Sequence, residues 1–265
     1  MNQTSIARLY ARYQRKINKY HSMATILGHD TVSWFLKKSL FWQRPNPFSG
    51  MMEPFPMVFS RRNLARDWTE ERQLYRENFV EIQDGKYIFS VRKMTSQEQQ
   101  EEAFGEYFSG MIQSEETISG ERGILLASLQ MLDTFKGAFP AIWLYATNPS
   151  QKGIAEIDVM EYVSQYPHHV HSNMHWGDSY NHSHHQNSKK IKADVKRMNE
   201  YGLVWDPKTI GWILNGRIIR VAANIYNDRD FVLKINLALG GWAEDPGGIP
   251  VQGKKMLFIP KVYRL

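Results

Sequence analysis

The sequence predicts an all-β protein, built as a sandwich or a barrel, that follows a helical N-terminal extension. Short segments of β-branched and aromatic residues recur from Trp68 onward, separated by Gly, Asp, Asn and Pro. Asn215-Gly216 stands between two of them, Ile210–Leu214 and Arg217–Val221, and this dipeptide is the strongest short-range signal for a β-hairpin. With 265 residues, the chain is long enough for one large all-β domain.

Residues 1–44 differ from the rest and predict a basic helical extension. Eight Lys and Arg residues against one Asp give this segment a charge of +7, so the other residues contribute −1 to the total of +6. We expect the helix to dock on the main domain, and binding to an anionic polymer or a membrane surface is the alternative. Its apolar side chains are spaced as one helical stripe, at Ile6, Leu9, Tyr10, Tyr13, Ile17 and Tyr20.

Residues 45–265 form the second predicted domain, which contains the strands. An irregular connector over residues 45–66 holds four prolines. Lys86–Arg92 then reads as a strand, directly after the turn signal Asp84-Gly85. The chain lacks cysteine, which excludes disulfides, thiol catalysis and Cys-ligated zinc. It also has no long apolar run and no apolar segment after Met1, so we expect no membrane span and no signal peptide.

The segment Ile154–Val163 places acidic residues at a spacing that suits catalysis. On a strand, Glu156 and Asp158 point to one face, and the apolar residues between and after them point to the core. Plain alternation would put Met160 on the acidic face, whereas one extra residue, a β-bulge, would bring Glu161 there instead. An ordinary acidic row facing solvent is the alternative.

Three carboxyl groups in such a row favour the hydrolysis of glycosides. Mutual repulsion keeps one of them protonated near neutral pH, and this reaction needs one protonated and one ionised carboxyl group. Enzymes that retain the anomeric configuration hold the two groups about 5–5.5 Å apart. Two glutamates that lean together over an intervening aspartate could reach that separation.

Several motifs, in the right order, closely resemble glycoside hydrolase family 16 over roughly residues 68–265. The Glu-x-Asp-x-x-Glu run at Glu156–Glu161 is the family's signature, in the form typical of its laminarinase-like branch, to which we also relate agarases and carrageenases. The other matching segments are Gly137–Leu144, His171–Gly177, Tyr201–Pro207, Ile210–Trp212 and Asn236–Trp242.

The resemblance implies a β-jelly-roll sandwich of two curved antiparallel sheets with an open concave cleft. It implies a retaining endo-glycosidase that acts by double displacement, with Glu156 as nucleophile, Asp158 as its hydrogen-bonding neighbour and Glu161 as general acid/base. The expected substrate is a β-linked polysaccharide, either a β-1,3-glucan such as laminarin or an algal galactan. A transglycosylase and a non-catalytic glycan-binding module are the alternatives. We expect an extracellular or periplasmic monomer that binds polysaccharide and not nucleic acid.

Three positions depart from the family pattern. Leu126 and Ser128 stand where the family usually has Glu and Arg, the latter often in contact with substrate, so an unusual substrate is favoured. Phe258 stands where an Asp commonly helps to hold a structural calcium ion. We therefore expect the calcium site to be lost or altered, and no cofactor to be required.

Aromatic residues are the first candidates for sugar contacts, because aromatic rings stack on the apolar faces of sugars. Trp143, Trp176 and Trp242 lie in the matching motifs and are predicted to bind substrate. For Trp176 a core position is the alternative, because it alternates with the polar residues of its strand. Trp205 and Trp212 lie in such motifs too, but we expect them to pack in the core.

A histidine-rich strand follows the acidic segment and supplies the second group of candidates. On a strand, His169, His171, Asn173 and His175 share one face and are predicted to line the cleft, the last three donating hydrogen bonds to sugar hydroxyls or meeting sulfate or carboxylate groups. A zinc or copper site on these imidazoles is the alternative. We predict no metal, because nothing else in the chain suggests ligand geometry.

Overall fold

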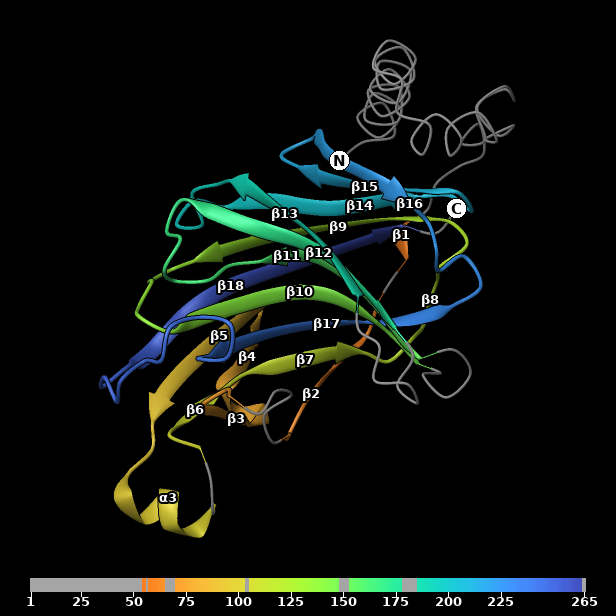
Figure 1. Cartoon of the computed structure of the whole chain (residues 1–265). Coiled ribbons are helices and arrows are strands. Elements are labelled where there is room, and N and C mark those ends of the chain that lie inside the picture. The colour runs from red at the N-terminus through yellow and green to blue at the C-terminus, as the bar shows by residue number, and fades with distance from the viewer. Residues whose placement is uncertain are drawn as a thin grey trace.

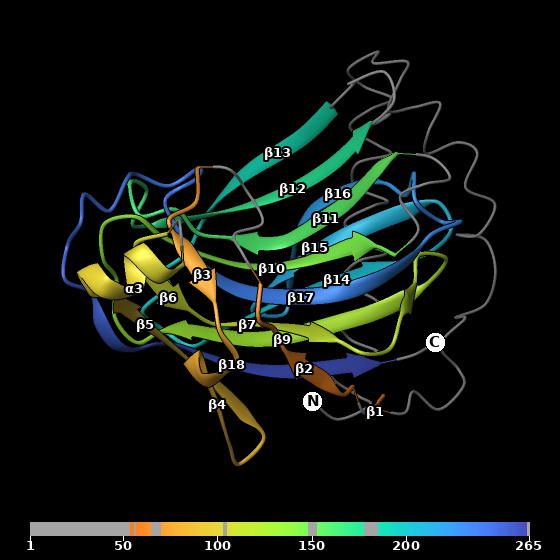
Figure 2. The ribbon, with the colours of Figure 1, turned by 90° about the horizontal axis from the view of Figure 1, so that it is seen from below.

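The computed structural model of the chain describes residues 54–55, 57–64, 70–102, 105–147, 153–177 and 185–263. This part of the chain is nearly all strand and forms two sheets that lie face to face (Figures 1 and 2), which confirms the predicted all-β sandwich. The basic helical extension predicted for residues 1–44 lies outside the described residues. Within the described ranges, no helix has the length and apolar character needed to cross a membrane.

The first sheet has ten strands and contains both ends of the described chain. Its spatial order is β16 (Arg217–Ala223), β15 (Thr209–Leu214), β14 (Asn199–Trp205), β9 (Gly123–Met131), β18 (Gln252–Tyr263), β5 (Lys86–Lys93), β6 (Tyr107–Ser109) and β3 (Gln73–Tyr75), with β1 (Pro54–Phe55) on β18 and β4 (Val80–Gln83) on β5. Its neighbouring strands are antiparallel, except that β3 and β6 run parallel.

The second sheet has eight strands and carries the acidic segment. Its spatial order is β13 (His185–Lys192), β12 (His169–Gly177), β11 (Ile154–Glu161), β10 (Ala138–Ala146), β17 (Asp230–Leu239), β7 (Met111–Ser114) and β2 (Phe59–Arg61), with β8 (Ile118–Ser119) on β17. Strand β11 therefore lies near the β13 edge, between β10 and β12 (Figure 2).

Two tight hairpins form where the sequence carries its strongest turn signals. Asn215 and Gly216 adopt φ values of 49° and 72° between β15 and β16, which confirms the predicted hairpin. Asp84 and Gly85 adopt φ values of 50° and 70° between β4 and β5. Left-handed backbone at both positions matches the twist of antiparallel strands, and Asn, Asp and Gly tolerate it best.

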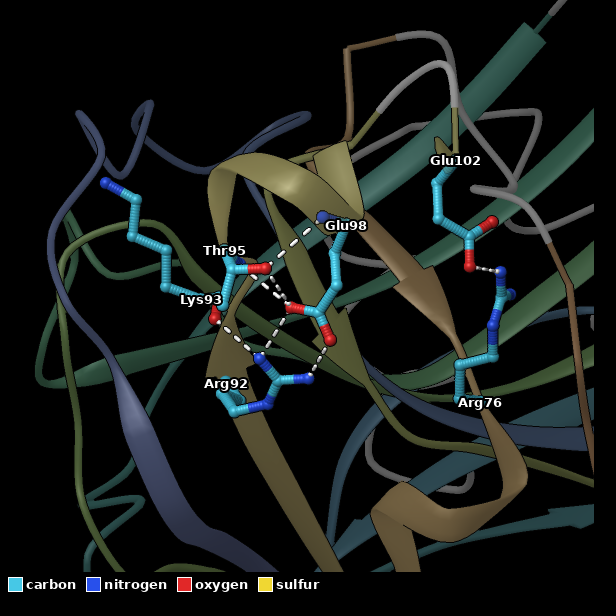
Figure 3. Close-up of polar contacts among 6 residues, drawn as sticks. All are labelled: Arg76, Arg92, Lys93, Thr95, Glu98 and Glu102. Atoms are coloured by element: carbon cyan, nitrogen blue, oxygen red, sulfur yellow. Dashed lines mark hydrogen bonds and ion pairs between the residues drawn. The ribbon is translucent and has the colours of Figure 1, made fainter. Parts of the chain in front are cut away.

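Two short helices, η2 (Glu77–Phe79) and α3 (Ser96–Glu101), lie among the described residues, and side chains anchor the second to β5. Thr95 and Glu98 form a capping box at the start of α3. Arg92 of β5 binds both carboxylate oxygens of Glu98, at 2.7 and 2.8 Å, as Figure 3 shows. These bonds hold the pKa of Glu98 at about 2. Arg76 and Glu102 form a second ion pair after the helix, at 2.5 Å (Figure 3).

The core lies between the two sheets and includes two of the tryptophans. Trp205 and Trp212 are 5% and 0% exposed, which confirms the prediction that both pack in the core. Gly123 makes room for Trp205, because a Cβ atom at that position would lie 2.3 Å from Cζ2 of the indole ring. The indole nitrogen of Trp212 donates a hydrogen bond of 2.8 Å to the backbone carbonyl of Asp158. The core thereby supports the strand that carries the acidic residues.

Candidate active site

Strand β11 contains the bulge that the acidic spacing requires. Asp158 pairs with Asn173 of β12 and Glu161 pairs with His171, so three steps along β11 match two steps along β12. The same extra residue separates the pairs that β11 makes with β10. Val159 and Met160 both have buried side chains in the core. The bulge therefore returns Glu161 to the face that Glu156 and Asp158 occupy, as predicted.

This face of the eight-stranded sheet points away from the ten-stranded sheet, and we call it the outer face. Glu156, Asp158 and Glu161 form one row on it, the carboxylate row. Strand β12 places a polar residue beside each member, because His175 pairs with Glu156 just as Asn173 and His171 pair with the other two. The predicted polar residues of β12 are thus brought together with the three carboxyl groups.

His175 contacts the exposed end of the row. Its Nε2 atom lies 3.1 Å from Oδ2 of Asp158 and 3.8 Å from Oε1 of Glu156. Oδ2 of Asp158 accepts no well-aligned hydrogen bond from the described residues, so its contact with His175 is electrostatic and depends on the imidazole proton. The hydroxyl of Tyr226 donates a 2.8 Å hydrogen bond to the carbonyl of His175 and fixes the backbone there.

Glu161 lies at the buried end of the row and is 8% exposed. Burial raises its pKa well above the usual value for glutamate, and the charges of Asp158 and Glu156 raise it further. A hydrogen bond from the amide Nδ2 of Asn173 to Oε2 of Glu161 acts in the opposite direction. Since burial dominates, Glu161 keeps its proton at a pH where an ordinary glutamate has lost it, and it can serve as a proton donor.

His171 is buried against the same end. Its ring packs on Trp242 at a centroid distance of 4.5 Å, and Nε2 has no hydrogen-bond partner within the described part of the chain. Burial lowers the pKa of His171 to about 4, and the nearby charge of Lys190 contributes. The imidazole is therefore neutral at physiological pH and can either donate or accept a hydrogen bond.

Two of the three predicted sugar-stacking tryptophans lie on the outer face. Trp143 of β10 pairs with Asp158, and its indole nitrogen donates a 2.8 Å hydrogen bond to Oδ1 of Asn236. Trp242 is 43% exposed and contacts His171 near Glu161. The oriented, partly exposed ring of Trp143 beside Asp158 and the exposed ring of Trp242 near Glu161 can each serve as a platform for a sugar.

The third tryptophan, Trp176, is not on this face, which corrects its predicted role as a cleft residue. It pairs with Ala155 of β11, one position before Glu156, and packs against the core. Its ring stacks on His185 of β13 at 5.7 Å. Strand alternation is the reason: His175 points outward, so the next residue points inward.

Leu126 and Ser128 also lie away from the row. They belong to β9 in the ten-stranded sheet, where Leu125 and Ala127 fill the core. Alternation therefore puts both departures from the family pattern on the outer side of the other sheet. The whole sandwich therefore lies between them and the carboxylate row, so their position does not support the expectation that they favour an unusual substrate.

Three residues of the site had no role in the sequence predictions. Asn236 and Lys234 of β17 hold Trp143, since the ammonium of Lys234 lies 4.3 Å from the centre of the indole ring. Because Lys234 and Asn236 are two positions apart on one strand, the sequence could have indicated that they share a face. Arg220 of β16 lies beneath β12 and is 4% exposed. A bulge in its pairing with β15 turns it inward, and no local sequence signal reveals that.

Within the described residues, one group of side chains could hold a metal ion, and the calcium position usual in the family is a separate question. Glu156, Asp158 and His175 each place a potential ligand atom within 4.8 Å of the others, a set that could hold a divalent cation. At the family's usual calcium position, Phe258 is fully buried and packs on Phe59 and Tyr87. Such aromatic surroundings do not suit calcium, which takes about six to eight oxygen ligands. Loss of that calcium site remains our prediction.

The architecture and the carboxylate row place the protein in the class of β-jelly-roll glycoside hydrolases. The family model described as "Glycosyl hydrolases family 16" matches residues 65–247, and the chain belongs to this family. A comparison with curated proteins found no match.

Several solved structures share the fold. The laminarinase catalytic domain from Thermotoga maritima MSB8 is 18% identical, with a TM-score of 0.65 over 78% of this chain and 92% of that one. The endo-β-1,3-glucanase from Pyrococcus furiosus is 22% identical, with a TM-score of 0.65 over 82% and 92%. A structure from work on endo-acting O-glycanases of human gut microbiota is 19% identical, with a TM-score of 0.67 over 83% and 94%.

Proposed function

We propose that the protein is a retaining endo-glycosidase that hydrolyses a β-linked polysaccharide, with Glu156 as nucleophile and Glu161 as general acid/base. The observation that carries this proposal is the contrast between the two glutamates. Glu161 is buried and keeps its proton, whereas the side chain of Glu156 is 23% exposed and lies near an imidazole. Double displacement needs one carboxyl group of each kind in one row.

The reaction runs in two steps on these groups. Glu161 donates its proton to the glycosidic oxygen while the carboxylate of Glu156 attacks the anomeric carbon, and a covalent glycosyl-enzyme forms. The ionised Glu161 then removes a proton from a water molecule, which attacks the same carbon and releases Glu156. Asp158, with a side chain only 3% exposed, lies between the two and tunes both charges. Two inversions at one carbon leave the configuration unchanged.

A β-1,3-glucan is the first candidate substrate, in keeping with the laminarinase-like form of the Glu-x-Asp-x-x-Glu motif. Two of the similar structures are described as a laminarinase and an endo-β-1,3-glucanase, and both share the fold of this chain. Trp143 offers an aromatic surface beside Asp158, and Trp242 offers another near Glu161, as a chain of neutral sugars requires.

An acidic galactan is the second candidate, and a cationic strip beside the row favours it. Lys190 and Lys192 of β13 pair with His171 and His169, so all four side chains share the outer face. Both lysines are exposed, and neither has an acidic partner among the described residues. Two strand spacings, or about 10 Å, separate this strip from β11. A sulfate or carboxylate on a sugar near the cleaved bond would be attracted there.

The test is a panel of neutral and sulfated β-glucans and β-galactans, with detection of new reducing ends. Cleavage of at least one member is expected, and NMR of the first products should show the β anomer. An initial α anomer would mean inversion and would overturn the assignment of Glu156 as nucleophile. Binding without any cleavage would favour the non-catalytic module. Products longer than the substrate, formed with added acceptor, would favour a transglycosylase.

A further inference from the structure

A series of aromatic rings crosses the outer face at the Glu161 end of the carboxylate row. We call it the aromatic array, and in order it consists of Phe139, Trp242, His171 and Tyr166. Neighbouring ring centres lie 6.0, 4.5 and 5.8 Å apart along it. On the last ring, the ammonium of Lys190 lies 3.5 Å from the ring centre. The array therefore passes the buried glutamate and ends on a cation of β13.

The two most exposed rings of the array, Trp242 and Tyr166, belong to loops that hydrogen bonds hold in place. The side chain of Gln165 donates to the carbonyl of Trp242 at 3.0 Å and accepts from the backbone N–H of Glu244 at 3.3 Å. The backbone N–H of Tyr166 donates to the carbonyl of Val163 at 2.9 Å. Because both rings are exposed, they are held where a ligand can reach them.

Lys190 carries a charge that no carboxylate of the described residues neutralises. Lys254, another exposed lysine, instead has the carboxylate of Glu81 at 2.6 Å. The face of the Tyr166 ring attracts the ammonium of Lys190 through the ring quadrupole, but it adds no negative charge. The ammonium is therefore held in one place and is still able to bind an anion.

Strand register distinguishes Lys190 from the other lysines of β13. Lys190 pairs with His171, which pairs with Glu161, so these three side chains share the outer face. The ammonium of Lys189 donates to a backbone carbonyl of β16 at 2.9 Å, so this side chain points to the opposite face. Lys192 lies two residues, or about 7 Å, farther along the strand. Lys190 is thus the lysine of β13 that lies at the array.

The histidines beside Lys190 add little positive charge at neutral pH. Burial lowers the pKa of His171 to about 4, and the charge of Lys190 contributes. Desolvation also lowers the pKa of His169, again with a contribution from Lys190. The Nε2 atom of His171 is buried and has no hydrogen-bond partner in the described part of the chain. A polar group of a ligand would satisfy it, since buried polar atoms are normally hydrogen-bonded.

We propose that the aromatic array and Lys190 form a subsite for an anionic sugar, in which Lys190 binds a sulfate ester or a carboxylate. A sugar chain that lies along the array passes Glu161, because the array runs from β10 to β13 across that end of the row. About 10 Å, or two strand spacings, separates β13 from β11. The anionic sugar is therefore a neighbour of the sugar whose bond is cleaved. Tyr166 is a positioning residue that holds the ammonium.

This inference rests on the proposed function for the place of the cleaved bond. The test measures kcat/KM on β-galactan and β-glucan oligosaccharides in three forms: sulfated, desulfated, and carboxylated by oxidation at C6. Lys190→Gln should lower kcat/KM roughly two- to fivefold on the anionic form that wild type prefers, with a smaller effect on the neutral form. Lys190→Arg should keep the preference. High salt should weaken it in wild type, because salt screens exposed charges.

Lys189→Gln is the matched control, because it removes the same charge from the neighbouring position on the opposite face. It should leave the preference for the anionic form unchanged. Tyr166→Phe keeps the ring beneath the ammonium and should retain the preference, whereas Tyr166→Leu should lose part of it. Equal losses on the anionic and neutral forms in Lys190→Gln would overturn the proposal. So would a loss of preference in Lys189→Gln as large as in Lys190→Gln.

Calorimetric binding of the same oligosaccharides to Glu156→Gln, with and without Lys190→Gln, separates this inference from the proposed function. Tighter binding of an anionic form that depends on Lys190 would support the subsite even if wild type cleaves no glycan, and only the glycosidase assignment would then fail. Cleavage without a preference that depends on Lys190 would reject the subsite and leave the glycosidase assignment intact. Binding of neither anionic form in a manner that depends on Lys190 would also reject it.

Discussion

The two ends of the carboxylate row carry the same residue type in different surroundings. Glu161 is buried, bonded to the amide of Asn173 and packed near His171. Glu156 is more exposed and lies 3.8 Å from the imidazole of His175. Burial disfavours the ionised form of Glu161, whereas the side chain of Glu156 is 23% exposed. The comparison teaches that the burial of each glutamate side chain, and not the residue type, distinguishes the proton donor from the nucleophile in the proposed mechanism.

The β-bulge in β11 and the polar residues of β12 together create this difference. The extra residue brings Glu161 back to the outer face, where it meets Ala141 on one side and His171 on the other. The loop after β17 then covers that end with Trp242. At the other end of the row, the side chain of Glu156 is 23% exposed, so the Glu156 end stays accessible.

Replacement of Glu156 or Glu161 by alanine should have the largest effect on the rate of cleavage. Glu156→Ala removes the nucleophile and should abolish cleavage of every substrate. Glu161→Ala removes the proton donor and should cost about 10²–10⁴-fold on polysaccharide, but less on aryl glycosides whose acidic phenols leave without a proton. Initial rates on both substrate types measure this. Added azide should restore the activity of Glu161→Ala by attacking the glycosyl-enzyme, with β-glycosyl azide as the product.

Glu121→Ala is the matched control, because Glu121 is exposed and pairs with Arg122 outside the row. Its rates should equal those of wild type. Near-wild-type activity of Glu161→Ala on polysaccharide would show that the buried end is not the acid, and Asp158 would be the better candidate.

Removal of the ring that covers the buried end should have the next largest effect. Trp242→Ala should raise KM roughly tenfold, since a stacked aromatic contributes about 0.5–1.5 kcal/mol beyond its buried area. Trp176→Ala is the control from the opposite face of β12: it should lower the unfolding temperature and leave KM unchanged. A rise in KM for Trp176→Ala alone would contradict the face assignment of both residues.

The pH dependence of stability should distinguish the buried glutamate from an exposed one. Glu161 has a raised pKa in the folded state, so the stability of wild type falls as the pH rises from the unfolded value through the folded pKa. The side chain of residue 161 cannot ionise in Glu161→Gln. The free energy of unfolding of this variant, relative to wild type, should therefore increase by up to about 1.4 kcal/mol per pH unit in that window. Thermal unfolding between mildly acidic and alkaline pH measures this.

Glu98→Gln should behave in the opposite way. The pKa of Glu98 is lowered to about 2 by Arg92, so its contribution is present above the unfolded pKa and disappears as the pH falls toward 2. The variant should therefore be slightly less stable than wild type at neutral pH. An advantage of Glu161→Gln that does not depend on pH would reject the raised pKa of Glu161.

Removal of metal ions should have the smallest effect on the rate of cleavage. Glu156, Asp158 and His175 could hold a cation at the accessible end, yet a bound cation would neutralise the carboxylate that must attack. We expect EDTA to leave the rate unchanged. A rate that falls with EDTA and returns with one divalent ion would show that this end is a metal site.

Much of the architecture was predictable because its causes are local. The turns at Asp84-Gly85 and Asn215-Gly216 need left-handed backbone that these residues tolerate, and the hairpins followed. Trp205 and Trp212 were correctly assigned to the core. For Trp176 the alternative was correct: it packs against the core, as plain alternation with His175 indicates, and not in the cleft as the resemblance to the family implied.

By itself, the sequence determined the all-β class, the common face of Glu156 and Asp158 and the alternation of His171, Asn173 and His175, because side-chain direction in a strand repeats every two residues. The depth of Glu161 and the inward turn of Arg220 were decided only by tertiary structure. Both follow from bulges, and a bulge depends on which distant strands pair and in what register. Burial, and with it the pKa of Glu161, is a property of those partners and not of the residue.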